Sequence, residues 1–131
     1  MGKVKRIIML LLTAFVLLVF TEKAYGEERG RLVYYKDGIF AEEEVIFSGN
    51  SIDRNCFILL KVLLNNKCAY SPDDLDICYS FFDEGVMWIG MNSSFESMAE
   101  AERSIITEQI TKTACSLKGV DSIMICVENS I

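Results

Sequence analysis

The chain has 131 residues, enough for one domain, and it carries a formal net charge of −6 and no histidine. An acidic chain repels nucleic-acid phosphates and anionic lipid headgroups, so nucleic-acid binding is disfavoured. Without histidine, Ser-His-Asp and Cys-His mechanisms are excluded within the chain, and the commonest metal ligand is missing.

The first 26 residues have the pattern of an export segment. Basic residues around Lys5 precede the apolar run 7–20, which has the length of the h-region of a secretory signal. A membrane-spanning helix usually needs about 20 apolar residues, so this run is short for an anchor. Ala24 and Gly26 supply the small side chains of a cleavage site. We therefore predict that residues 1–26 are a signal peptide, or an N-terminal membrane anchor if they are not cleaved.

The remaining residues, 27–131, are expected to form one acidic, exported domain. Residues 1–26 hold four of the 13 basic residues and one of the 19 acidic residues, so 27–131 hold nine and 18, for a formal charge of −9. The first cysteine is Cys56, so no lipid-attachment site follows the apolar run closely. The domain is expected to be secreted, or attached to the cytoplasmic membrane through the N-terminal segment.

The five cysteines form no recognisable metal or redox motif. There is no C-x-x-C pair, which a structural zinc site usually contains. An odd count leaves at least one thiol unpaired or bridged to a partner. Cys68 and Cys78 flank one loop and are the candidate disulfide pair, whereas Cys56 and Cys115 are expected on differently oriented helix faces. A small secreted ligand-binding or thiol module therefore stays open as an alternative function.

The first half of the domain predicts a strand and a helix. Residues 32–35 form the expected strand, which ends at a turn around Asp37. The acidic run 42–44 is expected in a solvated loop, with a short strand after it. Ser51 is the expected N-cap of a helix with one apolar face. That face should contain Ile52, Cys56, Leu59, Leu60 and Leu63.

A polar loop follows this helix and leads to a hairpin. Asp73, Asp74 and Asp76 lie together in the loop, where turn chemistry is the favoured explanation and paired acids of an enzyme are the alternative. Two apolar runs around the short turn at 83–85 then predict a hairpin over residues 76–92. Trp88 is expected in the core, with an exposed partner contact as the alternative.

The last part of the chain predicts a helix and a closing strand. Ser97 and Glu100 match a capping box at the start of a helix that runs to Leu117. Cys115 falls opposite the apolar stripe of this helix, so it is expected to be exposed, or covered by something other than the core that the stripe contacts. Residues 122–127 are apolar throughout and predict a central strand. The element order β-α-β-β-α-β indicates an α+β fold: a small antiparallel sheet with two helices on one face, as in ferredoxin-like domains.

Several of these segments resemble the GerM-type sporulation and spore-germination domain. The segments are the strand and turn 32–38, the turn at 84–85, the run 89–95 (Ile-Gly-Met-Asn-Ser-Ser-Phe), the helix segment 109–114 and the closing strand 120–127. The resemblance covers about 31–129. The chain departs from the family pattern in having Gly90 in place of Asp, Ala114 in place of Leu and Asn129 in place of Gly. It also has Asn65-Asn66 where a Gly-Pro often follows the first helix of the family.

The resemblance implies a ring-building-motif-like fold and a non-enzymatic, extracytoplasmic role in sporulation or germination. The implied partners are envelope or sporulation proteins, or further copies of the chain itself. No catalytic, cofactor-binding or metal-ligating residue is assigned, and no cofactor is expected.

Overall fold

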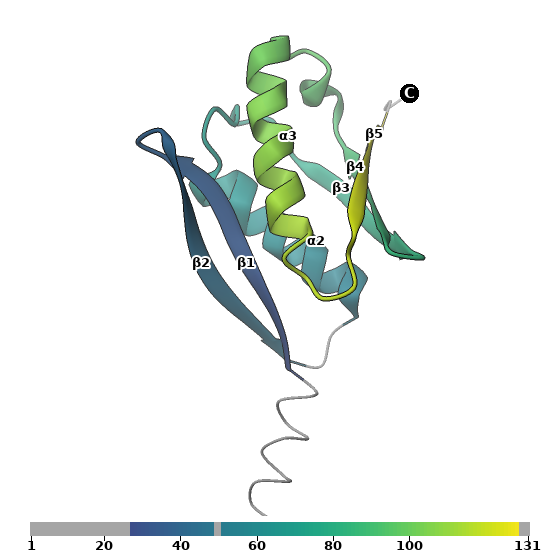
Figure 1. Cartoon of the computed structure of the whole chain (residues 1–131). Helices are drawn as coiled ribbons and strands as arrows, with labels where there is room; N and C mark the ends of the chain where they lie inside the picture. Colours follow the sequence, from purple (N-terminus) through teal and green to yellow (C-terminus); the bar gives the residue numbers. More distant parts are fainter. Residues whose placement is uncertain (1–26, 49–50, 129–131) are drawn as a thin grey trace, which may run out of the picture.

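The computed structural model describes residues 27–48 and 51–128 (Figure 1). The predicted signal peptide or anchor, 1–26, lies outside the described residues and stays a prediction. Within them, no helix is long and apolar enough to cross a membrane. The elements are β1 (Glu27–Lys36), β2 (Ile39–Ser48), α2 (Ile52–Val62) with a π-helical extension (Leu63–Lys67), β3 (Ile77–Asp83), β4 (Val86–Met91), a 3₁₀ turn (Ser93–Phe95), α3 (Glu100–Ala114) and β5 (Ser122–Val127).

Two helices lie between two small sheets (Figure 1). The hairpin β1–β2 covers one side of the helix pair, and the sheet β3–β4–β5 covers the other. The predicted α+β class is confirmed, and so is the packing of both helices on one face of the second sheet. The prediction of a single, wholly antiparallel sheet is corrected: the strands form two sheets, and β5 runs parallel to β4. The parallel pairing follows from the α3 connection, because a strand that returns through a helix enters the sheet in the same direction.

The separate sheet β1–β2 exists because 39–48 is a full strand and not a loop. Asp37 and the following glycine have φ angles of 54° and 80°, which is the geometry of a two-residue hairpin turn. The acidic residues 42–44 lie within β2, where basic neighbours offset their charge. Glu44 contacts Arg29 at 3.2 Å and Glu42 contacts Arg31 at 3.4 Å.

The third acid of this run, Glu43, points the other way and forms a small polar cluster. The Tyr34 hydroxyl donates to its Oε1 at 2.9 Å, and Lys67 Nζ lies 3.1 Å from the same oxygen. These two hydrogen bonds, first from Tyr34 and then from Lys67, lower the pKa of Glu43. Each of the three glutamates therefore has a basic or hydroxyl partner within the chain.

The core is made by one face of each helix and the inner faces of both sheets. The predicted face of α2 is confirmed, and the Ser51 side chain accepts from Arg54 N at 3.3 Å as its N-cap. The predicted capping box of α3 is wrong. The helix starts at Glu100 after an Ala99 N-cap, and the Ser97 hydroxyl donates to the Ser93 carbonyl at 3.4 Å, inside the preceding 3₁₀ turn. The buried core contains Cys56, Leu59, Leu60, Leu63, Met87, Ile89, Met91, Ile106, Ile110, Ala114 and Leu117.

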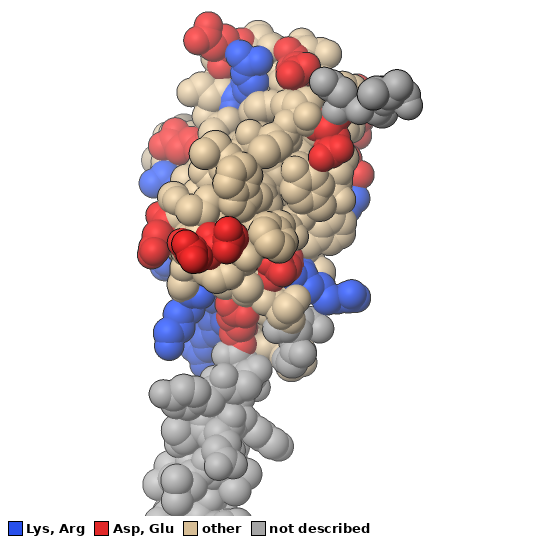
Figure 2. Space-filling view, turned by 90° about the vertical axis from the view of Figure 1, so that its right-hand side faces the viewer, with Lys and Arg blue, Asp and Glu red and all other residues tan. Residues whose placement is uncertain are grey.

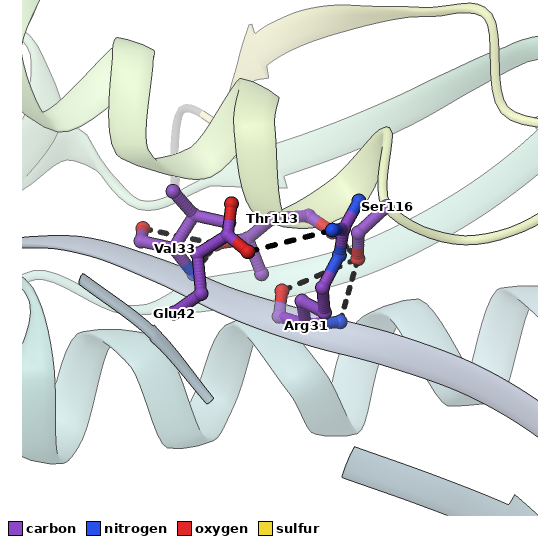
Figure 3. A network of polar contacts seen from close by, with 5 residues as sticks. All are labelled: Arg31, Val33, Glu42, Thr113 and Ser116. Carbon is purple, nitrogen blue, oxygen red and sulfur yellow. Dashed lines mark hydrogen bonds and ion pairs between the residues drawn. The ribbon is translucent and has the colours of Figure 1, made fainter. Parts of the chain in front are cut away.

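Polar side chains of α3 and the turn after it bind the open edge of β1 (Figure 3). Thr113 Oγ1 accepts from Val33 N at 2.9 Å and donates to Val33 O at 3.2 Å, and all of these atoms are buried. Ser116 Oγ accepts from Arg31 N at 2.7 Å. The helix thus supplies donors and acceptors where a neighbouring strand would stand.

A fully buried amide completes this contact. Gln109 Oε1 accepts from Tyr35 N at 3.0 Å and from Ala69 N at 2.9 Å. Its Nε2 donates to Ala69 O at 3.0 Å and to Ile105 O at 3.3 Å. A buried amide needs such partners to offset its desolvation, and Gln109 has four. It therefore joins α3, β1 and the loop after α2.

Candidate functional site

The outer face of the sheet β3–β4–β5 is the most prominent unpartnered surface of the fold. Phe81, Trp88 and Met124 lie opposite one another on the three neighbouring strands. Their side chains are 56%, 37% and 49% exposed. Figure 2 looks onto this side of the molecule and shows a broad uncharged area with both acidic and basic side chains around it. An in-register apolar row across a sheet is a surface that a protein partner can cover.

The exposure of Trp88 corrects the prediction that it lies in the core. Side chains alternate between the two faces of a strand, and Met87, Ile89 and Met91 occupy the inner face of β4 with no exposure. Both helices pack on that inner face, so Trp88 is left on the outer one. The sequence shows that β4 is apolar on both faces, but it does not show that only one is covered.

Tyr79 extends the apolar row towards the other end of the sheet. It pairs with Gly90, and a Cβ atom at Gly90 would overlap the ring of Tyr79. The glycine therefore leaves room for the ring to lie against β4. This gives a physical reason for one departure from the family pattern, because an aspartate side chain would occupy the same space. Burial, followed by the neighbouring Cys126 and Glu128, raises the pKa of Tyr79.

Acidic residues border the outer face at both ends of its strands. Asp83 and Glu84 lie at the β3–β4 turn, and the backbone N–H of Asp121 donates to a carbonyl of that turn at 2.8 Å. At the other end, Glu128 is close enough to Tyr79 to influence its titration. The border therefore favours partners with basic residues around an apolar centre.

Two of the three aspartates of the polar loop, Asp74 and Asp76, have structural partners. Asn92 Nδ2 donates to Asp74 O at 2.6 Å, and Asn92 Oδ1 accepts from Asp76 N at 3.2 Å. The Asp76 carboxylate forms an ion pair with Lys61 at 2.7 Å. These contacts agree with the turn chemistry that the sequence favours, and they leave Asp76 paired with a cation and not with a second acid. Among the described residues, no group of three Cys, Asp or Glu side chains is arranged to hold a metal ion.

All five cysteines are free thiols, including the candidate pair Cys68 and Cys78. Burial raises the pKa of Cys56 and of Cys68 to about 12, so neither forms a thiolate readily. Cys78 is exposed on β3.

Cys115 packs partly buried against the core and is not exposed as predicted. Cys56 lies in the core cluster against which Cys115 packs. The helical-wheel argument fails here because α3 ends at Ala114 and is covered from two sides, by β1 and by β5.

Two solved structures share this fold at low sequence identity. One is a candidate lipoprotein from Clostridium perfringens: it is 15% identical, with a TM-score of 0.51 over 82% of this chain and 78% of that chain. The other contains the tandem GerMN domains of the sporulation protein GerM from Bacillus subtilis. It is 14% identical, with a TM-score of 0.53 over 78% of this chain and 39% of that chain, so the present chain spans about two fifths of it.

No family model matches the chain, and no curated protein matches it by sequence. The likeness to the solved structures establishes the fold. The predicted GerM-type, ring-building-motif-like domain is therefore confirmed as a fold.

Proposed function

We propose that the chain is a non-enzymatic interaction domain that acts outside the cytoplasmic membrane in sporulation or germination. In this proposal the outer face of β3–β4–β5 packs against envelope or sporulation proteins, or against further copies of the chain. The observation that carries the proposal is the in-register row of Phe81, Trp88 and Met124, which exposes large apolar side chains on a sheet face. Covering such a row removes apolar area from water and favours association.

Three further observations support this role. The two solved structures with this fold are a candidate lipoprotein and the domains of a sporulation protein. The chain has no histidine, and Asp76, one of the three aspartates of the polar loop, forms an ion pair with Lys61. The N-terminal segment 1–26 has the composition of a signal peptide or membrane anchor.

The test is a deletion strain of the source organism, complemented with variants of the chain. We expect deletion to reduce spore yield or germination, and the wild-type chain to restore it. Trp88→Ser should fail to restore it although the protein accumulates and folds. Ile46→Ser is the matched control, because Ile46 is also an exposed apolar strand residue, at 57%, but lies on β2.

Two outcomes would overturn the proposal. One is unchanged spore yield and germination in the deletion strain. The other is full complementation by Trp88→Ser, which would show that the outer face is not the surface used.

A further inference from the structure

Two of the strand edges in this fold are closed by side chains. The β1 edge is bound by Thr113, Ser116 and Gln109, as described above. On the β3 edge, the Asp53 carboxylate at the start of α2 accepts from Phe82 N. Unpaired strand edges attract further strands, so covering them prevents unwanted pairing.

The other two edges, on β2 and β5, differ in charge. The β2 strand carries the three consecutive glutamates 42–44, and charges on an edge strand oppose pairing with another chain. The β5 strand reads Ser-Ile-Met-Ile-Cys-Val and carries no charge. In the part of the chain that the structure describes, no side chain hydrogen-bonds to the backbone of β5 between Ser122 and Val127.

The free hydrogen-bonding groups of β5 can be identified from its pairing with β4. Ser122 N donates to the Gly85 carbonyl at 3.3 Å, and Glu128 N donates to the Met91 carbonyl at 2.8 Å. In a parallel pair these bonds recur at every second residue. The N–H and C=O groups of 123, 125 and 127 therefore point away from β4, towards the open edge.

A groove of about 630 Å³ runs beside this edge, between β5 and α3. Its apolar lining includes Ile123, Ile125 and Phe95, and its rim includes Glu100 and Glu108 of α3. The volume is in the range of sites that hold small ligands, about 300–1,000 Å³. The groove thus combines free backbone donors and acceptors with an apolar wall and an acidic rim.

We propose that the β5 edge binds an extended segment of a partner protein, which adds as a fourth strand to the sheet β3–β4–β5. The segment pairs its backbone with 123, 125 and 127 and places alternate apolar side chains into the groove. Lys or Arg side chains of the segment lie against Glu100 and Glu108. One basic residue of the groove, Arg103, already lies over the Phe95 ring at 6.0 Å.

The charge of the domain favours a different protein, and not a second copy of the chain, as the occupant of the β5 edge. Residues 27–131 carry a formal charge of −9, so two copies joined edge to edge would bring like charges together. A basic segment gains from the same charges. This inference rests on the proposed interaction function, but it assigns the partner to an edge and groove that share only Met124 with the row on the outer face.

The test is selection of a random 12-residue peptide library, displayed on phage, against the purified full-length chain. We expect enrichment of proline-free peptides with alternating apolar residues and at least one Lys or Arg. Ser104→Trp should reduce binding of a selected peptide at least tenfold, because Ser104 is an exposed residue of the groove and the indole would fill the groove. Ala101→Trp is the matched control, since Ala101 is exposed on α3 outside the groove lining. Bound peptide should also slow amide hydrogen exchange at 123, 125 and 127.

Glu100→Lys tests the contribution of charge without filling the groove. It should weaken the binding of basic peptides severalfold and strengthen the binding of peptide variants in which Lys is replaced by Glu. The inference is overturned if no extended basic peptide is enriched, or if Ser104→Trp and Ala101→Trp bind the selected peptides equally. It is also overturned if exchange slows only when the chain associates with itself at high concentration. Trp88→Ser distinguishes the two proposals, because it should abolish complementation yet leave peptide binding unchanged.

Discussion

Replacing Thr113 with valine tests whether α3 holds the β1 edge through its hydroxyl. Valine has nearly the same shape, so packing is preserved while both hydrogen bonds to Val33 are lost. A buried donor or acceptor left without a partner costs about 1–3 kcal/mol. The added methyl returns up to about 0.8 kcal/mol of burial. For one donor and one acceptor these terms give about 1–5 kcal/mol, and we expect the free energy of unfolding to fall by about 3 kcal/mol, the middle of that range.

The assay is urea unfolding followed by circular dichroism, with the midpoint and slope fitted separately. The midpoint should fall while the slope stays constant, because the surface exposed on unfolding hardly changes. Thr113→Ser keeps the hydroxyl and loses one methyl, so it should cost only about 1 kcal/mol. Thr111→Val is the matched control: the Thr111 hydroxyl bonds only to the Thr107 carbonyl one turn earlier in the same helix, so its loss should cost about 0.5 kcal/mol or less.

A stability of Thr113→Val equal to that of Thr113→Ser would refute the reasoning. So would amide protection of 31, 33 and 35 that is the same in Thr113→Val as in the wild type. Either result would mean that packing alone, without the hydroxyl, fixes the hairpin on the helix.

Further predictions concern the sheet face, the thiols and the polar cluster. Gly90→Ala should destabilise the fold by about 1–3 kcal/mol in urea unfolding, because its methyl group would overlap the Tyr79 ring. A second substitution, Tyr79→Ser, should restore most of this loss. A Gly90→Ala variant as stable as the wild type would contradict the prediction. Iodoacetamide should label Cys78 fastest and Cys56 slowest in the native chain, and it should label five thiols after denaturation. Equal labelling rates of Cys78 and Cys56 in the native chain would contradict the burial of Cys56. Glu43 has a lowered pKa in the folded state, so ionised Glu43 stabilises the fold. This stabilisation is fully present above the ordinary pKa of 4.5 and is lost as the pH falls through the folded-state pKa. Acid should therefore destabilise the wild type more than Glu43→Gln, and parallel pH curves would contradict this.

The sequence predicts those parts of the fold that depend on local pattern. The apolar face of α2, its Ser51 cap, the turn at Asp37 and the hairpin turn at 83–85 follow from periodicity and turn residues, and the structure has all of them. The strand 39–48 was missed because three adjacent glutamates are typical of loops. Its neighbours Arg29 and Arg31, which offset the charge, come into range only through the pairing with β1.

The candidate site was harder to predict because periodicity shows which faces are apolar and not what covers them. Trp88 lies in a strand that is apolar on both faces, and only the placement of both helices on one side leaves it exposed. Cys115 shows the opposite error. Its angle about the axis of α3 places Cys115 away from the apolar stripe of the helix. The two sheets on either side of the helix nevertheless leave Cys115 partly buried.

The contact between α3 and β1 also has a consequence for how this fold can vary. The helix recognises the peptide groups of β1, which are common to all residues except proline, so the outward side chains of β1 are free to change. The helix has no such freedom at Gln109 and Thr113, where a hydroxyl or amide of fixed length must reach the strand. Divergent members of this fold should therefore differ widely in their first strand while keeping hydrogen-bonding residues at the matching helix positions. Aligning such chains on the polar side of α3, and not on the sheet, would then reveal relatives that whole-sequence similarity misses.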